Sequence, residues 1–332
     1  MTGGGRTGPA HPPSLKAGQE LTTAFIFPGQ GSQFVGMGRA LAEASPAARE
    51  VFGEVDEALG QNLSRLMFEG PEEELTLTRN AQPAIMALGL AVAATLEREA
   101  GVRLSEVAVA VAGHSLGEYS ALAAAGALPL SGTARLLRLR GEAMQAAVPP
   151  GAGAMAALLG LGLADVRRIA AAAADGQVCA AANDNAPGQV VVSGHIEAVT
   201  RAMRLAKMEG ARHSVLLPVS APFHCPLMAP AADAMRAALD ATRILPPVVP
   251  LWANVTAAPV TDPAEIRLLL VEQVTATVRW RETVEAMAAA GITRMVELGG
   301  RVLGPMVKRI APDVANLAVQ KPEDVDQLLK AL

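Results

Sequence analysis

The sequence Gly-His-Ser-Leu-Gly at residues 113–117 contains a side chain that can carry out chemistry, Ser115. A serine flanked in this way by two glycines is typical of a sharp turn between a strand and a helix, which exposes the hydroxyl. An exposed hydroxyl can attack an acyl group, and the backbone N–H of Leu116, at the start of the expected helix, can stabilise the oxyanion. An ordinary structural turn is the alternative interpretation.

A nucleophilic serine needs a base, and five histidines are candidates. These are His11, His114, His195, His213 and His224. The first lies in the N-terminal tail, the second diverges from its neighbour Ser115, and the next two fall in an expected small domain. His224, in the loop sequence PVSAPFHC, is the predicted base, with a structural histidine as the alternative. No acidic residue stands out as a third member, so a backbone carbonyl is a candidate to orient the imidazole.

Cys179 and Cys225 are the only cysteines. Two isolated cysteines form neither a disulfide framework nor a zinc site, which fits a reducing compartment and a cytoplasmic protein. Cys225 follows His224 directly, and adjacent side chains do not readily face each other. We therefore expect Cys225 to be a buried thiol rather than a second nucleophile, and we expect no metal site.

The elements around Ser115 are those of an open parallel α/β sheet. Residues 22–32 form a β-rich run that ends in Gly-Gln-Gly, and residues 106–113 form a valine-rich strand. Helical patterns cover about residues 34–59 and 81–99. Residues 116–128 form a helix of small residues, so Ser115 lies between a strand and a helix.

Residues 149–218 follow the order βαββαβ, which is that of ferredoxin-like subdomains. We expect them to form an inserted small subdomain, with residues 21–148 and 219–332 as the α/β catalytic core. Residues 1–20 are rich in glycine and proline and are predicted to be a disordered tail. The later patterns are helices at 223–240, 262–274 and 281–291, a strand at 292–300 and a helix in the second half of 316–332.

Composition excludes several classes of protein. The chain has 332 residues, a formal net charge of −4 and 3% aromatic residues, which argues against nucleic acid as the main partner. The longest apolar stretch, AIMALGLAVAATL, is too short to span a bilayer, and the tail has no apolar region typical of a signal peptide. We therefore expect no membrane association.

Six motifs occur along the chain in a fixed order. They are FIFPGQGSQ, GHSLGE, RLRGEAMQ, NDNAPGQVVVSG, APFHC and ELGGRVLGPMVKRI. Together they resemble the malonyl-CoA:acyl carrier protein transacylases of type II fatty acid synthesis, over residues 22–332. The resemblance implies a hydrolase-like α/β core with a ferredoxin-like insertion. It also implies transfer of a malonyl group from malonyl-CoA to acyl carrier protein, by a monomer that needs no cofactor.

The resemblance also implies roles for individual residues. The backbone N–H of Gln30 joins that of Leu116 in the oxyanion hole, and the main-chain carbonyl of Gln273 orients the catalytic histidine. Arg140 matches the arginine that pairs with the free malonyl carboxylate, a role suited to a planar guanidinium with two parallel donors. The alternative for Arg140 is a solvated surface arginine.

The remaining features leave more than one interpretation open. Asn183 matches a loop lining the cleft, but a hairpin turn explains it equally well. Phe223 stands where many bacterial members carry a small polar residue, and we expect it to crowd the acyl group. Lys308, Arg309 and the basic residues of 201–212 are candidates for docking an acidic carrier protein, or ordinary solvated helix faces.

Three other functions remain as alternatives at this point. The first is a free-standing acyltransferase of polyketide synthesis or of a malonate decarboxylase. The second is a serine thioesterase or esterase, against which Arg140 and the Gly-Gln-Gly strand end argue. The third is a non-catalytic module that binds carrier protein, against which the intact Ser115 and His224 argue.

Overall fold

Six strands form the central sheet of the computed structural model, which describes residues 22–332. The expected tail at residues 1–20 lies outside the described residues. The strand order is β10-β9-β1-β2-β7-β8, and all neighbours are parallel except β7 and β8. The strands are β1 (Thr23–Phe27), β2 (Ala110–Gly113), β7 (Leu251–Ala253), β8 (Ala258–Val260), β9 (Arg294–Leu298) and β10 (Ala315–Val319).

Side chains of β1 alternate between two apolar cores, because successive residues of a strand point to opposite faces. Phe25 and Phe27 pack into the larger core, on the helices of the first half of the chain. Ala24 and Ile26 pack into a second core with Trp280. Burial on both faces explains why the β1 sequence TAFIF is almost continuously apolar.

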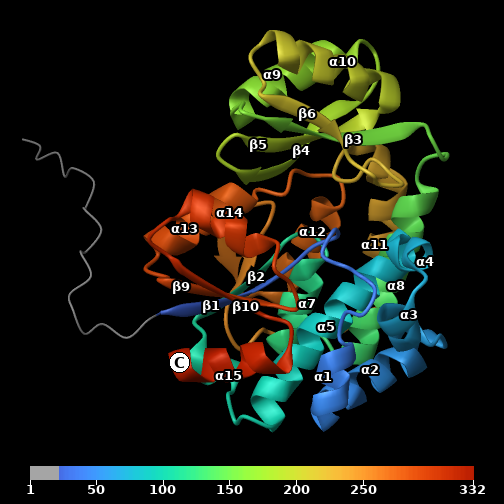
Figure 1. Cartoon of the computed structure of the whole chain (residues 1–332). Helices are drawn as coiled ribbons and strands as arrows, with labels where there is room; N and C mark the ends of the chain where they lie inside the picture. Colours follow the sequence, from blue (N-terminus) through green and yellow to red (C-terminus); the bar gives the residue numbers. More distant parts are fainter. Residues whose placement is uncertain (1–21) are drawn as a thin grey trace, which may run out of the picture.

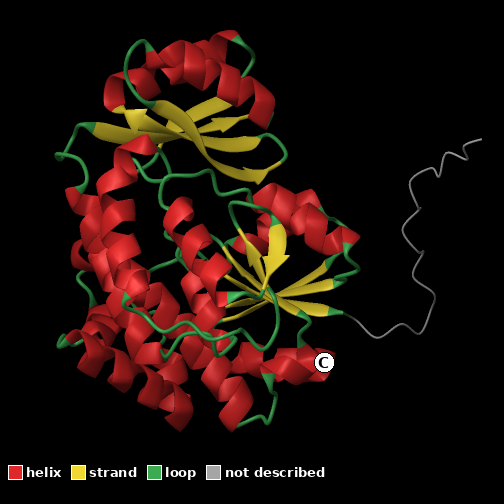
Figure 2. Ribbon diagram, turned by 180° about the vertical axis from the view of Figure 1, so that it is seen from behind, coloured by secondary structure: helices red, strands yellow, loops and turns green. Residues whose placement is uncertain are grey.

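Helices cover both faces of this sheet (Figure 2). The larger core is built around the long buried helix α5, which packs against α2 and α8. The helices of the first half are α1 (Arg39–Ala44), α2 (Pro46–Leu59), α3 (Leu63–Glu69), α4 (Glu72–Thr76), α5 (Thr78–Arg98), α6 (Leu104–Val107), α7 (Gly117–Ala124) and α8 (Leu130–Ala146). Those of the second half are η1 (Pro226–Met228), α11 (Ala229–Asp240), α12 (Pro263–Gln273), α13 (Trp280–Ala289), α14 (Leu303–Ile310) and α15 (Pro322–Ala331).

A separate antiparallel sheet of four strands, in the order β4-β5-β3-β6, forms the small subdomain. Its helices α9 and α10 cover the face that points away from the rest of the molecule (Figure 1). The chain order is β3 (Gly153–Leu159), α9 (Leu163–Ala174), β4 (Cys179–Ala186), β5 (Gln189–His195), α10 (Ile196–Met208) and β6 (His213–Leu216). This is the expected βαββαβ order, so the predicted fold class is confirmed.

The two faces of the small sheet have different neighbours. Val190 and Val192 of β5 pack under α9 and α10, whereas Val191 and Met155 belong to the core shared with the large part. The face with Val191 and Met155 therefore packs toward the large part of the molecule. No helix within residues 22–332 is long and apolar enough to cross a membrane.

Several elements differ from the sequence-based expectations. The helical pattern at 34–59 is divided at Ser45, whose side chain accepts a hydrogen bond from the N–H of Ala48 and so begins α2. β7, β8, α14 and β10 were not expected. Each is only three to eight residues long, which is too short for a pattern to identify.

Candidate active site

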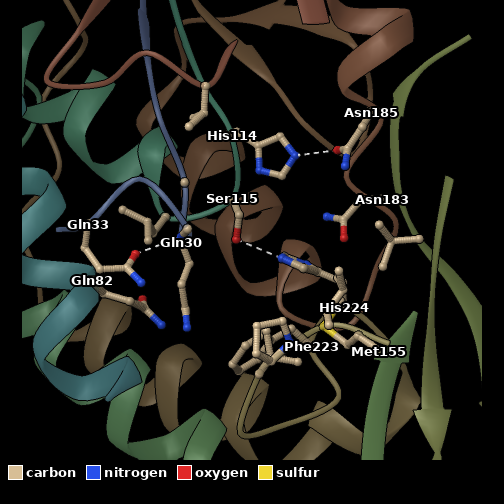
Figure 3. Close-up of a pocket in the computed structure, with 18 of the residues that line it drawn as sticks. Gln30, Gln33, Gln82, His114, Ser115, Met155, Asn183, Asn185, Phe223 and His224 are labelled. Carbon is tan, nitrogen blue, oxygen red and sulfur yellow. Dashed lines mark hydrogen bonds between the residues drawn. The ribbon is translucent and has the colours of Figure 1, made fainter. Parts of the chain in front are cut away.

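Ser115 occupies a tight turn between β2 and α7. Its backbone has φ of 54°, the left-handed region that residues with a side chain rarely adopt. The flanking glycines allow the turn, since a Cβ at Gly113 would lie 1.9 Å from the backbone of Gly117. A Cβ at Gly117 would likewise lie 2.3 Å from the carbonyl oxygen of Phe27 on β1. The geometry exposes the Ser115 hydroxyl to the pocket, as the Gly-x-Ser-x-Gly spacing predicts (Figure 3).

His224 faces Ser115 from the segment that returns from the small subdomain (Figure 3). Its Nε2 lies 2.8 Å from the Ser115 Oγ, and its Nδ1 lies 2.9 Å from the carbonyl oxygen of Gln273. A carbonyl only accepts, so Nδ1 carries the proton and Nε2 is free to accept the serine proton. Burial, and then the positive charge of Arg140, lower the pKa of His224 to about 3, so the imidazole is neutral.

Two backbone N–H groups border the space in front of the Ser115 hydroxyl. They belong to Gln30, in the loop after β1, and to Leu116, before α7, and both residues line the pocket. Among residues 22–332, neither N–H has an acceptor. The N–H of Ser115 is already used, because it donates to the Oδ1 of Asn254 at 2.8 Å. The backbone N–H groups of Gln30 and Leu116 are therefore candidate donors to an oxyanion.

Arg140 is a buried cation beside the nucleophile. Only 1% of its surface is exposed, whereas Arg135 on the same helix is exposed and Arg138 is half-buried. Its guanidinium donates to the Ser115 Oγ at 3.1 Å. Burial lowers the pKa of Arg140, but a guanidinium remains charged at neutral pH.

The hydrogen bonds of Arg140 are to neutral groups. They are made to the Oε1 of Gln82 at 2.9 Å and to the Oε1 of Gln273 at 2.8 Å, and no carboxylate of the described chain forms an ion pair with Arg140. Glu118 acts on the guanidinium only through space, and a buried charge without a direct ion pair is costly. The site is therefore suited to an anionic group carried by a substrate.

The pocket around Ser115 has a volume of about 500 Å³. The small subdomain contributes an apolar wall with Met155 and Val191, and Phe223 lies beside the base. Asn183 lines the pocket, and the Oδ1 of Asn185 accepts a hydrogen bond at 2.8 Å from the Nε2 of His114 (Figure 3). Both asparagines belong to β4, so they are strand residues that face the cleft rather than a hairpin turn.

The structure brings all the predicted site residues together. Ser115, His224, Arg140 and Gln273 are linked by hydrogen bonds, and the remaining four line the same pocket, namely Gln30, Leu116, Asn183 and Phe223. Cys225 is buried and donates to the carbonyl oxygen of Pro222 at 3.2 Å, away from Ser115.

Three polar residues of the site were not predicted from the sequence. Gln82 and Asn254 lie far from any recognised motif, and nothing in their local sequence distinguishes them. Glu118 lies within the GHSLGE motif, and its position in that motif could have identified it as a residue of the site. No group of three or more histidine, cysteine, aspartate or glutamate residues within 22–332 could hold a metal ion.

The fold and this arrangement are those of an acyltransferase. The family described as "Acyl transferase domain" matches residues 24–300. A malonyl CoA-acyl carrier protein transacylase of Bacillus subtilis (strain 168) is 44% identical over 311 residues, which cover 93% of this chain and 96% of that protein. The chain therefore belongs to the malonyl CoA-acyl carrier protein transacylase family.

Solved structures agree with this assignment. The acyl-carrier-protein S-malonyltransferase of Bartonella henselae superposes with a TM-score of 0.92 at 51% identity, covering 94% of this chain and 99% of that chain. A malonyl-transacylase in complex with a type II polyketide synthase acyl-carrier protein superposes with a TM-score of 0.90 at 40% identity. That match covers 94% of this chain and 100% of the other.

Proposed function

We propose that the protein transfers the malonyl group of malonyl-CoA to the phosphopantetheine thiol of acyl carrier protein, through an ester on Ser115. The observation that carries this proposal is the buried Arg140, 3.1 Å from the Ser115 Oγ and without a carboxylate partner among the described residues. A plain esterase needs the serine and the histidine but has no use for a buried cation beside the acyl group.

In the first half-reaction the thioester carbonyl of malonyl-CoA accepts hydrogen bonds from the N–H groups of Gln30 and Leu116. The malonyl carboxylate binds Arg140. The Ser115 oxygen attacks the carbonyl carbon while its proton passes to the Nε2 of His224. The C–S bond breaks, the CoA thiolate takes the proton from His224, and the malonyl ester remains on Ser115.

In the second half-reaction the phosphopantetheine thiol of the carrier protein enters the same pocket. His224 accepts the thiol proton, and the sulfur attacks the ester carbonyl held by the same two N–H groups. The C–O bond to Ser115 breaks, and the serine oxygen recovers its proton from His224. Since proton transfer and charge stabilisation come from protein side chains and backbone, the proposal involves no metal or redox cofactor.

The substrate also changes the strength of the base. Arg140 is the second cause, after burial, of the lowered pKa of His224. A malonyl carboxylate paired with Arg140 offsets that positive charge and raises the pKa of His224 while the malonyl group is bound. The base therefore becomes stronger with the substrate that carries a carboxylate.

We further propose that the protein acts as a monomer in the cytoplasm and supplies fatty acid synthesis. The cytoplasmic location extends the interpretation of the two isolated cysteines. Polyketide synthesis is a second candidate pathway, because one similar structure holds a type II polyketide synthase carrier protein. Malonyl-transfer rates measured side by side with the carrier proteins of both pathways would distinguish the two candidates.

A groove between α10 and β6 is the proposed docking surface for the carrier protein. It is lined by the exposed cations Arg204, Lys207 and Arg212, and no residue of the described chain forms an ion pair with them. Residues 217–219 continue from β6 into the wall of the active-site pocket. Carrier proteins are acidic, so the charge of this groove is complementary. Arg309 of α14 is less suitable, because it already donates to Gln189 and to the carbonyl oxygen of Pro187.

Intact-mass measurement after incubation with malonyl-CoA, with and without carrier protein, tests the proposed function. We expect one malonyl group on the protein alone, its loss when holo carrier protein is added, and an equal gain on the carrier. Ser115→Ala should gain no malonyl group. A malonyl group on the Ser115→Ala protein, or its release as free malonate at the same rate without carrier protein, would refute the proposal.

A salt series tests the docking surface. The KM for carrier protein should rise with salt, while the KM for free pantetheine stays constant. Lys207→Glu should raise the first KM and leave the second unchanged, and Lys308→Glu on α14 is the matched control. An equal change in the KM for carrier protein in the two lysine variants would show that the groove is not the docking surface.

A further inference from the structure

Glu118 is a buried carboxylate that the mechanism above does not use. It lies on the first turn of α7, three residues after Ser115, and only 1% of its surface is exposed. It does not face the substrate pocket, since it is absent from the residues that line it. A buried carboxylate is costly unless its oxygens accept hydrogen bonds, so its contacts define its role.

Both oxygens of Glu118 accept hydrogen bonds from groups that hold the active site. Oε1 accepts from the backbone N–H of Asn254, and Oε2 accepts from the side-chain Nε2 of Gln273. The side chain of Asn254 in turn accepts from the N–H of Ser115 at 2.8 Å and donates to the carbonyl oxygen of Gly113 at 2.7 Å. Glu118 therefore contacts the nucleophile turn through Asn254 and the arginine site through Gln273.

The amide of Gln273 has one donating end and one accepting end, and Glu118, together with the Ser115 carbonyl oxygen and the Oδ1 of Asn254, determines which way it points. A carboxylate only accepts, so the donating Nε2 must face Glu118, where it also donates to the carbonyl oxygen of Ser115 at 2.9 Å. The accepting Oε1 then faces Arg140 at 2.8 Å. The opposite orientation would place two donors against each other at Arg140.

We propose that Glu118 is a positioning residue for acyl selectivity, because its carboxylate fixes the Gln273 amide so that Oε1 holds the Arg140 guanidinium beside Ser115, where it binds the acyl carboxylate. This inference rests on the proposed function, and it assigns Glu118 a role in discriminating malonyl from acetyl groups. The competing explanation is that Glu118 only fastens α7 to the segment containing Asn254. In that case its loss would change stability but not selectivity.

Glu118→Gln separates the two explanations, since it keeps the size of the side chain and replaces an acceptor by a donor. The backbone N–H of Asn254 cannot turn, so the new amide oxygen stays there and the new NH₂ group faces Gln273. This NH₂ group and the Nε2 of Gln273 are then two opposed donors, so the Gln273 side chain shifts and its Oε1 no longer holds Arg140 in place. The guanidinium shifts, and the malonyl carboxylate loses part of its partner while an acetyl group is unaffected.

The experiment measures kcat/KM for malonyl-CoA and acetyl-CoA with holo carrier protein as acceptor, at about pH 9, because Glu118 is ionised only above its raised pKa. We expect Glu118→Gln to lower the malonyl-to-acetyl ratio by about tenfold or more, the factor that corresponds to one lost hydrogen bond to a charged group. Glu297→Gln is the matched control, because Glu297 is also fully buried but accepts from the N–H groups of Val302, Leu303 and Gly304 and does not contact Gln273 or Arg140. Its ratio should stay within about twofold of the wild-type ratio.

A Glu118→Gln ratio within the range of the control would overturn the inference, provided that the wild-type protein transfers malonyl groups. Absence of malonyl transfer by the wild-type protein would instead refute the proposed function. Thermal unfolding of both variants shows whether each is folded, and a fall in ratio shared equally by both variants also counts against Glu118.

The pH dependence of the wild-type ratio gives a second test that needs no variant. Burial raises the pKa of Glu118 to about 8, partly offset by hydrogen bonds from Asn254 and Gln273 and by the charge of Arg140. Below that pH the protonated oxygen faces a donor, so the Gln273 orientation weakens. Above it both oxygens accept. The malonyl-to-acetyl ratio should therefore rise as pH increases through about 8.

Other titratable groups near Glu118 do not change charge in this range. Arg140 of α8 stays protonated, and burial raises the pKa of Tyr119, the next residue of α7, to about 12. Burial keeps His114 and His224 neutral by lowering their pKa values. We expect the rise in the wild-type protein and a flat ratio in Glu118→Gln. A flat wild-type ratio between about pH 6.5 and about pH 9.5 would overturn the inference.

Discussion

Arg140→Ala is the substitution whose effect follows most directly from the geometry of the site. The guanidinium lies 3.1 Å from the nucleophilic oxygen and is almost completely buried. Without it, the malonyl carboxylate enters a dehydrated pocket in which Gln82 and Gln273 present amide oxygens. Two acceptors and an anion then face one another without a donor.

The magnitude follows from the cost of an unpaired buried charge. Removing one partner of a buried charge pair costs about 2–5 kcal/mol. At about 1.4 kcal/mol per factor of ten, kcat/KM for malonyl-CoA should fall by about 30-fold to about 4,000-fold. Acetyl-CoA has no carboxylate, so its transfer should be unchanged or faster.

Competition between malonyl-CoA and acetyl-CoA for one enzyme sample provides the assay, because any loss of folded protein cancels from the ratio of the two products. Arg135→Ala is the matched control, with the same substitution on an exposed face of the same helix. We expect the control to keep the wild-type ratio. A malonyl-to-acetyl ratio unchanged in Arg140→Ala would show that Arg140 does not bind the acyl carboxylate.

Three further outcomes are expected. Because the pKa of His224 in the free protein is lowered to about 3, kcat/KM for acylation by malonyl-CoA should be constant from about pH 4.5 to about pH 6.5; an inflection of kcat/KM near the ordinary histidine pKa would contradict this. Phe223→Ser should open space beside the base and raise methylmalonyl relative to malonyl transfer by about 10-fold, without changing the malonyl-to-acetyl ratio; an unchanged methylmalonyl rate would show that Phe223 does not crowd the acyl group. Asn254→Ala should lower the free energy of unfolding by about 1–3 kcal/mol and slow acylation, since the N–H of Ser115 loses its acceptor; an unchanged melting temperature would argue against that role.

The parts of the site that sequence could predict are those encoded by local pattern. The turn at Ser115 needs glycines at fixed spacing, because neighbouring backbone lies 1.9 Å from where a Cβ of residue 113 would be and 2.3 Å from where a Cβ of residue 117 would be. Its signature is therefore contiguous in sequence. The βαββαβ order of the small subdomain was likewise visible, since each strand and helix there has its own periodicity. His224 could be reached by elimination among five histidines.

Other parts depend on contacts that no local pattern contains. Arg135, Arg138 and Arg140 lie on one helix and have similar sequence surroundings. Which of them is buried depends on how α8 packs against its neighbours, including α5. Gln82 and Asn254 acquire their roles from partners 58 and 139 residues away along the chain. The strand β7, which precedes Asn254, has three residues and no detectable alternation.

Both members of the nucleophile–base pair have left-handed backbone conformations, with φ of 54° at Ser115 and 57° at His224. A residue with a side chain pays about 1–2 kcal/mol for this conformation, whereas glycine does not. The side chain of Ser115 contributes little packing. Mutation of Ser115 to glycine therefore relieves backbone strain and also removes the nucleophilic hydroxyl. Thermal selection alone would therefore drive this position toward an inactive sequence. A screen for thermostable variants of this protein should include an activity step in each round, because relief of backbone strain at Ser115 also removes the nucleophile.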